Sequence, residues 1–336
     1  MNKSIIPVPI KYSINTLLIA GFLVVGSLIT QGGLLTRAYN DLILEIGTFI
    51  ILAVSLNLAA GYLGQLPLGH AGFMAVGAYS GALFWRSDLL MGTSSVVGGL
   101  VVAGLVAAVF GIIIGVPALR LRGDYLAIIT LGFGEMIRIL IMNIPSITRG
   151  AMGLTQIPRH SNFLTVYVCV VICCLVIHMM MKSRHGRAIL SIRDNEIAAE
   201  SCGISTTYYK VMAFAVSAFF AGVAGALYAG RLTVLVPGDF DFMMSINILM
   251  IVVLGGMGSM LGSIIGAVVL TSLPLLMLGL NQYRMVIYAL LLIIVMIFKP
   301  SGLMGTYDFS LGRVFEGVGS LATRLKQRKG ELSDGT

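Results

Sequence analysis

The sequence has few charged residues, which make up 11% of its 336 positions. A soluble globular domain carries about 25% charged residues, because its surface faces water. Here 57% of the residues are hydrophobic and the mean hydropathy is +0.97, so polar side chains are too few to cover a water-facing body of this size. The composition excludes an ordinary soluble protein and predicts an all-α polytopic membrane protein, whose main solvent is lipid.

The sequence also lacks the signatures of common enzymes. It contains no Gly-Lys dipeptide, and hence no phosphate-binding P-loop, and it has no G-x-S-x-G, H-E-x-x-H or C-x-x-C pattern. Its four histidines are scattered, and three of its four cysteines lie in one apolar run that no cluster of histidines or carboxylates joins at metal-ligand spacing. We therefore predict no catalytic residue, no metal site and no cofactor, and a chain that cannot itself hold ATP in the Walker manner.

Long apolar stretches fill most of the sequence. We predict about ten membrane-spanning helices, within a range of eight to ten, near residues 12–30, 42–61, 66–85, 95–118, 125–143, 163–181, 210–231, 244–258, 260–278 and 285–298. The first stretch has no small-residue cleavage site after it, so we interpret it as a retained span rather than a signal peptide. These spans form a predicted transmembrane domain over residues 1–305, followed by a polar, basic cytoplasmic tail at 306–336.

The distribution of Lys and Arg predicts the orientation. An even number of spans places both termini on one side, and with that side inside, fifteen of the 22 basic residues fall in inner segments. Six fall in outer segments, and one, Arg138, lies within a span. An excess of Lys and Arg on the cytoplasmic side is typical of membrane proteins. We therefore predict cytoplasmic N- and C-termini, and the net charge of +8 requires no nucleic-acid partner.

The longest predicted inner loop covers residues 182–209, with the sequence KSRHGRAILSIRDNEIAAESCGISTTYY. It is polar, yet it contains several Ala, Ile and Leu residues and no Pro. This composition favours one or two short helices outside the membrane. Such helices are more structure than a simple connection between two spans requires.

One apolar region is interrupted by polar and helix-breaking residues. The segment LNLAAGYLGQLPLGHAGFMAVGAYSGA begins at Leu56 and contains Asn57, Gln65 and His70 among several Gly and one Pro. In lipid, an irregular backbone is tolerated only where protein or a water-filled cavity satisfies its polar groups, and transporters place broken helices around the solute path. We predict Asn57, Gln65 and His70 as candidates for lining that path. The alternative is a short inner turn whose Gly residues allow close packing.

Glu135 and Arg138 are charged residues inside a predicted span. A lone charge at the bilayer centre costs about 3 kcal/mol or more, and a partner three residues away on the same helix face lowers that cost. We predict that the pair points into the helix bundle, either as a structural ion pair that fixes the packing or as part of the solute path. Glu45, near the outer end of another span, is interpreted as interfacial.

Small residues recur at four-residue spacing within the spans. The sets are Gly77 and Gly81; Gly111 and Gly115; and Gly258, Gly262 and Gly266. This spacing places small residues on one helix face and predicts close helix–helix contacts.

Five ordered segments resemble a known family, the LivM-type permeases of branched-chain amino acid ABC importers, over residues 42–305. The segment LNLAAGYLGQLPLGHAGFMAVGAYSGAL is similar to the family's GYxGQxSLGHAxFxxxGAY stretch, with Pro67 where Ser is commoner. LRLRGDYLAIITLGFGEMIRIL is similar to the family's LRLRGxYxAIxTLxFxExxR stretch. The later segments are GRAILSIRDNEIAAESCGISTTYYKVMAFAVSAFFAGVAGALYA, VVLGGMGSMLGSIIGA and FKPSGLMG.

The resemblance implies a function and partners. It implies the permease subunit of an ATP-binding cassette importer that moves branched-chain amino acids across the bacterial inner membrane. Such a subunit pairs with a second, related permease, binds two cytoplasmic ATPase subunits and receives solute from an extracytoplasmic binding protein. Loop 182–209 is then the coupling element that docks in the ATPase. Its implied coupling residues are Arg193, Asp194, Asn195, Glu196, Ala198, Ala199 and Gly203.

Two features leave alternatives open. The general importer loop pattern is Glu-Ala-Ala, three residues and Gly; here Glu196 stands one place early and Ile197 takes its position, although the LivM-type form of the loop fits. Relatives of this pattern also serve urea or short amides, so the substrate is open between these solutes and branched-chain amino acids. The alternative from another class is a secondary transporter or channel that works without ATP, in which Glu45, Glu135 and the broken helix at 61–70 would serve proton or ion coupling. The inner loop separates the two interpretations, because a lone carrier has no need of the Ala-Ala-x-x-x-Gly pattern at 198–203.

Overall fold

The computed structural model describes residues 36–87, 93–121 and 123–276, with single positions near residues 26–32 and 283–305. The chain divides into two units, and the larger one, Leu35–Thr306, contains all the helices described below. Most of the predicted spans at 12–30 and 285–298, and the whole predicted tail at 306–336, lie outside the described residues.

Continuous apolar runs fold as helices because the bilayer offers no partner for backbone N–H and C=O groups. The long helices are α2 (Arg37–Asn57), α3 (His70–Arg86), α4 (Thr93–Ala118), α5 (Asp124–Met142), α7 (Phe163–Lys182), α10 (Thr206–Leu232), α11 (Phe242–Gly255) and α12 (Met260–Leu276). The short elements are the π-helix η1 (Leu58–Tyr62), α6 (Pro145–Thr148), η2 (Gly150–Met152), α8 (Arg184–Asp194), α9 (Glu196–Ser201) and η3 (Pro237–Phe240). Among the described residues, five helices are long and apolar enough to cross a membrane.

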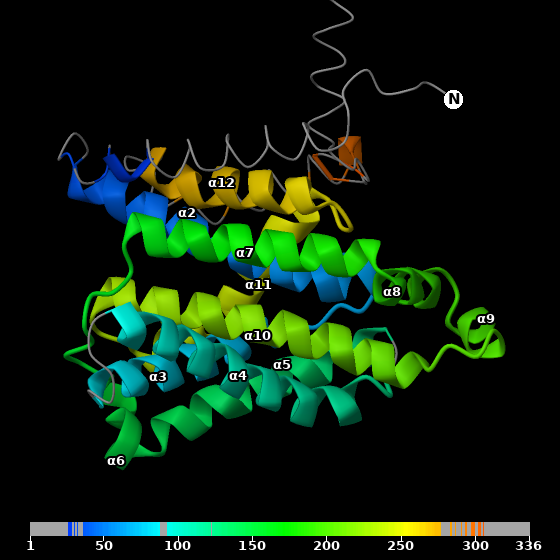
Figure 1. Cartoon of the computed structure of the whole chain (residues 1–336), viewed down its shortest axis with the longest axis horizontal. Coiled ribbons are helices and arrows are strands. Elements are labelled where there is room, and N and C mark those ends of the chain that lie inside the picture. Colours follow the sequence, from blue (N-terminus) through cyan, green and yellow to red (C-terminus); the bar gives the residue numbers. More distant parts are fainter. Residues whose placement is uncertain are drawn as a thin grey trace, which may run out of the picture. The chain divides into compact units, whose positions relative to one another are not determined.

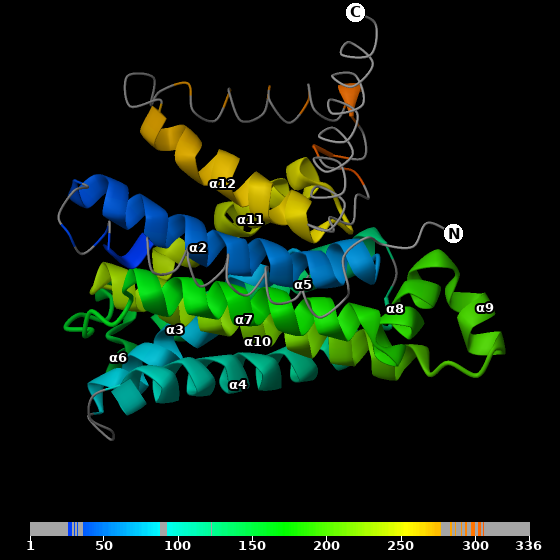
Figure 2. The ribbon, with the colours of Figure 1, turned by 45° about the horizontal axis from the view of Figure 1, so that its top comes forward.

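Helix α10 lies at the centre of the bundle, between α3 and α4 on one side and α2 on another (Figures 1 and 2). Small residues bring these backbones together, as the spacing predicts. A Cβ atom on Gly77 of α3 would overlap the backbone of Gly222 of α10, and one on Gly111 of α4 would overlap the side chain of Ala218. The predicted close contacts of these glycines are therefore confirmed.

Helices α11 and α12 form a hairpin that packs against α2. Gly262 and Gly266 of α12 approach the backbone of Gly255 in α11, again as the four-residue spacing predicts. Gly258 does not follow the prediction, because it lies in the turn between the two helices and not on a helix face. Its φ of 84° is a conformation that glycine adopts without the steric cost that a side chain brings.

The outer helices of the bundle turn apolar side chains outward. Within their most apolar windows, α5 is 22% buried and α7 is 28% buried, whereas α2 with η1 is 72% buried. Exposed residues of α4 and α7 include Val97, Val101, Leu105, Val109, Leu164, Ile172 and Leu175. Apolar side chains on the outer surface are expected of helices whose outer faces contact lipid or another membrane-spanning chain.

The two ends of the bundle differ. Helices α8 and α9 project at one end, and α6 lies at the other (Figure 1). We call these two ends of the bundle the α8–α9 end and the α6 end. The predicted pair of short helices within 182–209 is confirmed by α8 and α9. The sequence placed the start of the third span at 66, but α3 begins at His70 because residues 64–69 form an irregular segment.

Candidate functional site

The predicted break near residue 61 is a real interruption of the helical bundle. Helix α2 ends in the π-helical turn η1, and residues 64–69 then run without regular structure to the start of α3. Single π-helical turns inside α-helices occur frequently at functional sites. The segment from Leu58 to Gly69 is called the helix break below.

Asn57 joins the helix break to the α11–α12 turn. Its Nδ2 donates to the carbonyl oxygen of Ser259 at 2.9 Å, and its Oδ1 accepts from the N–H of Gly258 at 2.8 Å. The side chain is fully buried, so both ends of the amide are satisfied where water has little access. Gly61 makes this contact sterically feasible, because a Cβ there would overlap both Asn57 Oδ1 and Gly258 N.

The start of α3 is tied to three neighbouring helices. His70 Nε2 lies 3.0 Å from Ser55 Oγ of α2 in a buried hydrogen bond. The N–H of Leu68 donates to Thr130 Oγ1 of α5 at 3.0 Å, and the N–H of Ala71 donates to Ser245 Oγ of α11 at 3.2 Å. The last two bonds satisfy backbone N–H groups at the start of α3, where a helix has no intrahelical acceptors for them.

The three path candidates of this region differ in exposure. Asn57 and His70 are buried and hydrogen-bonded within the chain, whereas Gln65 is half-buried. Gln65 donates its backbone N–H to the carbonyl oxygen of Ala59 at 3.0 Å. All three lie in or beside the helix break, so the structure brings them into one region, and a role in lining the solute path remains a prediction.

Glu135 and Arg138 form the ion pair that their spacing suggests. Arg138 Nη2 lies 2.8 Å from Glu135 Oε2, and the side chains are 26% and 30% exposed. The buried face of α5 is formed by other residues, including Thr130 and Ile137. The pair therefore lies at the border between the packed face and the outward face of α5, apart from the contacts around Asn57.

Helix α8 is attached to the bundle by its apolar face. Ser183 caps its start by accepting from the N–H of Gly186, and Ile189 and Ile192 are buried. At its end, Arg193 Nη1 donates to the carbonyl oxygen of Gly61 in the helix break at 3.3 Å. Arg193 also pairs with the neighbouring Asp194 at 3.2 Å. Helix α8 thus contacts the helix break directly.

Helix α9 is short but firmly held. Asn195 caps it, because its Oδ1 accepts from the N–H of Ala198 at 3.0 Å. Glu196 Oε1 lies 2.7 Å from Lys210 Nζ. At the other end, Gly203 has a φ of 80° and its N–H donates to the carbonyl oxygen of Glu200 at 2.9 Å, which is a helix termination typical of glycine.

Lys210 stands at the start of the predicted span 210–231 and is a buried charge. It lies in the first turns of α10 with its side chain 4% exposed, because α10 begins at Thr206. The carboxylate of its partner Glu196 faces the bundle and pairs with this buried ammonium group. The predicted role of Glu196 in coupling stays a prediction.

The outward surface of α9 is formed by other residues. Ala199 is buried against the bundle, whereas Ile197 is 66% exposed and Ala198 is exposed beside it. Asp194 and Asn195 are exposed at the junction of α8 and α9. This surface, together with the exposed Arg193 and Gly203, is accessible to another molecule.

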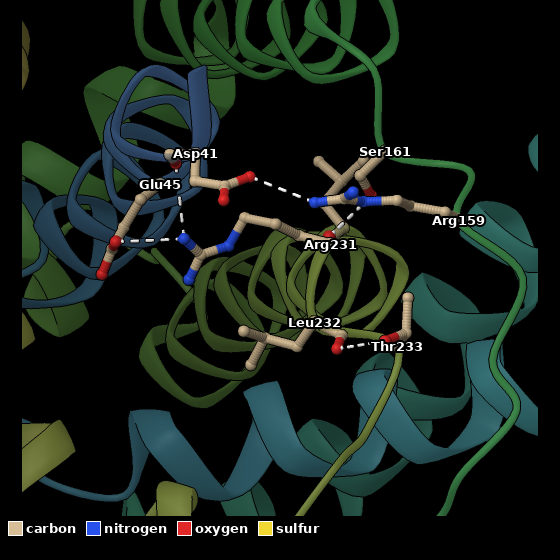
Figure 3. Close-up of polar contacts among 8 residues, drawn as sticks. Asp41, Glu45, Arg159, Ser161, Arg231, Leu232 and Thr233 are labelled. Atoms are coloured by element: carbon tan, nitrogen blue, oxygen red, sulfur yellow. Dashed lines mark hydrogen bonds and ion pairs between the residues drawn. The ribbon is translucent and has the colours of Figure 1, made fainter. Parts of the chain in front are cut away.

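The α6 end carries an ion-pair cluster that the sequence did not predict (Figure 3). Arg231 at the end of α10 lies 3.0 Å from Glu45 of α2, and its side chain is 10% exposed. Arg159 lies 3.2 Å from Asp41 in the same region. Arg231 also lies over the ring of Tyr228, 5.4 Å from its centroid, which adds a cation–π contact. Glu45 is therefore a partner in helix packing and not only an interfacial charge.

A cavity of about 660 Å³ lies between α4, α7 and α10. Its wall is mostly apolar, with His160, Asn162 and Thr165 as its polar members. His160 contacts Trp85 edge to face, and partial burial lowers the pKa of its imidazole below the usual 6.5. None of the predicted site residues lines this cavity. Among the described residues, no group of His, Cys, Asp and Glu has the arrangement of a metal site.

Comparisons with known proteins agree on one family. The family described as branched-chain amino acid transport system, permease component, matches residues 39–296. The high-affinity branched-chain amino acid transport system permease protein LivM of Salmonella typhimurium is 38% identical over 313 residues, covering 81% of this chain and 71% of that protein. LivM of Escherichia coli is 39% identical, covering 76% and 67%. The permease protein LivH of Escherichia coli is 24% identical, covering 81% and 95%. No solved structure gives a significant match.

The family match covers more than half of the chain, and its residues include the helix break, α8 and α9. Together with the membrane-spanning helices, it identifies a multi-pass protein of the bacterial inner membrane. The chain belongs to the permease components of branched-chain amino acid transport systems.

Proposed function

We propose that this permease subunit belongs to an ATP-binding cassette importer that carries branched-chain amino acids into the cytoplasm. It assembles with a second, related permease, two cytoplasmic ATPase subunits and an extracytoplasmic solute-binding protein. ATP is hydrolysed on the ATPase subunits, and this chain supplies part of the path through the membrane.

The observation that carries the proposal is the construction of the α8–α9 element. A helix as short as α9 is not stable by itself, because helix nucleation is costly. Here Asn195 caps it, Ala199 anchors it, and Glu196 ties it to Lys210 of α10. A rigid projection that ends in an exposed Ile197 is suited to docking in a groove of an ATPase subunit.

Two further observations support the partners. The chain is similar to both LivM and LivH proteins over most of its length, as expected if two related permease chains share one fold. Helix α5 is the least buried of the five long apolar helices, which leaves an apolar surface for lipid or for the second permease. The names of the relatives support branched-chain amino acids as the solute.

Co-purification tests the docking surface. The tagged chain is solubilised from native membranes, and the proteins recovered with it are identified. We expect two ATPase subunits with the unsubstituted chain and their loss with Ile197→Asp. The matched control is Ile147→Asp in α6, because Ile147 is 54% exposed and lies at the opposite end of the bundle. Equal recovery of the ATPase subunits with both variants would contradict docking through α9.

Uptake into liposomes tests the function and the solute. The purified complex with its binding protein is supplied with labelled leucine, isoleucine or valine, and with urea or acetamide as competing solutes. We expect ATP-dependent uptake of the amino acids. Uptake of urea or acetamide without uptake of the amino acids would show that the substrate is urea or a short amide. Uptake by the chain alone without ATP would establish a self-sufficient carrier instead of an importer subunit.

A further inference from the structure

Arg193 lies where the docking element meets the interrupted helix. It belongs to the last turn of α8, directly before α9, and its guanidinium reaches the carbonyl oxygen of Gly61 at 3.3 Å. Gly64 also packs against it, because a Cβ on Gly64 would lie 2.9 Å from Arg193 Cγ. The side chain therefore contacts the helix break at two points, Gly61 and Gly64.

The carbonyl groups at the end of η1 explain why an arginine is needed there. The last carbonyls of a helix have no intrahelical donors and carry partial negative charge. The carbonyl of Leu58 accepts from the N–H of Leu63, and that of Ala59 accepts from the N–H of Gln65. The carbonyl of Gly61 accepts from Arg193 instead. A cation from α8 thus completes the termination of a helix that belongs to another part of the bundle.

The same point is joined to the α11–α12 turn. Gly61 packs against the backbone of Gly258, and Asn57 one turn earlier bonds to Gly258 and Ser259. A Cβ on Gly258 would lie 3.5 Å from Arg193 Nη1. The end of α8, the helix break and the α11–α12 turn therefore form one continuous set of contacts.

We infer that Arg193 is a positioning residue that transmits movement of the docking element to the helix break and the α11–α12 turn. The inference rests on the proposed function, since it requires ATPase subunits that move α8 and α9. A displacement of α8 carries the guanidinium with it, and the charge-assisted bond to Gly61 draws the end of α2 along. Asn57 then passes the displacement to the turn between α11 and α12. Arg193 contributes to coupling, whereas docking depends on the exposed surface of α9.

The ratio of solute moved to ATP hydrolysed tests this role in the reconstituted complex with its binding protein. Arg193→Gln removes the cation and is expected to lower the ratio about tenfold, as the loss of one charge-assisted hydrogen bond allows. ATPase subunits should still co-purify, because docking depends on the exposed surface of α9. Arg187→Gln is the matched control, because Arg187 lies on the same helix, is exposed and donates to the carbonyl of Lys182 at the end of α7.

Arg193→Lys serves as the second variant, because an ammonium group retains the charge and can still cap a carbonyl although it lacks the fork of the guanidinium. We expect Arg193→Lys to recover part of the ratio of solute moved to ATP hydrolysed that Arg193→Gln loses. A distance measurement supplies a readout that a merely structural role would not move. Spin labels on the exposed Cys202 and on Met257→Cys in the turn report whether α9 and the turn move together.

In the unsubstituted complex, the distance between these labels should stay narrowly distributed with and without ATP, and in Arg193→Gln it should change on ATP binding. An unchanged transport ratio in Arg193→Gln would overturn the role of Arg193. A label distance in Arg193→Gln that does not change on ATP binding would overturn it as well. Failure of the unsubstituted chain to recover ATPase subunits would instead overturn the proposed function. The two failures are therefore distinguishable.

Discussion

Replacement of Asn57 by Ala tests whether the helix break and the α11–α12 turn are held together as the structure indicates. The substitution removes both hydrogen bonds of the amide, at 2.9 Å to Ser259 and 2.8 Å from Gly258. A buried polar group that loses its partner costs about 1–3 kcal/mol. Because the carbonyl of Ser259 still accepts from Ser263, and the N–H of the half-buried Gly258 can donate to water, we expect a total loss of about 1–3 kcal/mol.

Thermal unfolding of the detergent-solubilised protein measures this loss. In a background in which Cys169, Cys174 and Cys202 are replaced by Ser, a thiol-reactive dye reports exposure of Cys173, which is fully buried in α7. The matched control is Asn143→Ala, because Asn143 is exposed and donates only to the carbonyl of Ile139 in its own helix at 2.8 Å. We expect a marked fall of the midpoint for Asn57→Ala and a shift equivalent to about 0.5 kcal/mol or less for the control. Equal midpoints for the two variants would refute the reasoning.

Asn57→Asp provides a second, chemically sharper comparison. The substitution keeps an oxygen that can accept from the N–H of Gly258, but it places a second oxygen against the carbonyl of Ser259. Loss of a donor at nearly constant size separates hydrogen bonding from packing. We expect a loss at least as large as for Asn57→Ala, because a charged group is then buried without its donor. Native stability of the aspartate variant would show that the amide donor is dispensable.

Three further predictions concern the ends of the bundle. Glu196→Ala leaves the buried ammonium of Lys210 without this partner and should lower the free energy of unfolding by about 2–4 kcal/mol. Adding Lys210→Met should restore most of this loss, as a double-mutant cycle of unfolding midpoints measures. Gly203→Ala should lower the free energy of unfolding by about 1–2 kcal/mol, because a side chain is strained at the φ of 80° found there. Gly203→Asn should cost less, and the same unfolding assay measures both variants. Burial lowers the pKa of His160, so stability should fall as pH drops below 6.5, where the unfolded state gains the proton first. His160→Gln should flatten that dependence of the midpoint between pH 7 and 5, and parallel curves would contradict the assignment.

The sequence predicted those features of the fold that depend on local pattern. Apolar runs marked the helices, because their backbone groups must be satisfied within each helix. The cluster of Gly and Pro between Gly61 and Gly69 marked the helix break. The mixture of polar and apolar residues in 182–209 marked α8 and α9. Each of these signals is contained in a stretch short enough to be recognised without knowing what it packs against.

The features that the sequence did not predict join distant residues. Glu45 and Arg231 are separated by 186 positions, and nothing in the surrounding residues of either indicates the other. Glu196 and Lys210 are only 14 positions apart, but the extra turn of α10 before Lys210 decides that the ammonium is buried. Helix boundaries shift by a few residues for reasons of tertiary packing, and such shifts determine which charges need partners.

Two kinds of contact hold the bundle together, and they resist movement differently. Helices α3, α4 and α10 meet through glycines such as Gly77 and Gly222, where backbones touch and any sliding would create overlaps along the whole contact. The helix break is joined to the α11–α12 turn by the bonds of Asn57 and the close approach of Gly61 to Gly258, and it is joined to α8 by the bond of Arg193. Close-packed surfaces move as rigid bodies, whereas a small number of hydrogen bonds can shift with little loss of packing. A displacement that enters at α8 therefore passes through the polar joint, and the glycine-packed helices provide the fixed frame against which it acts.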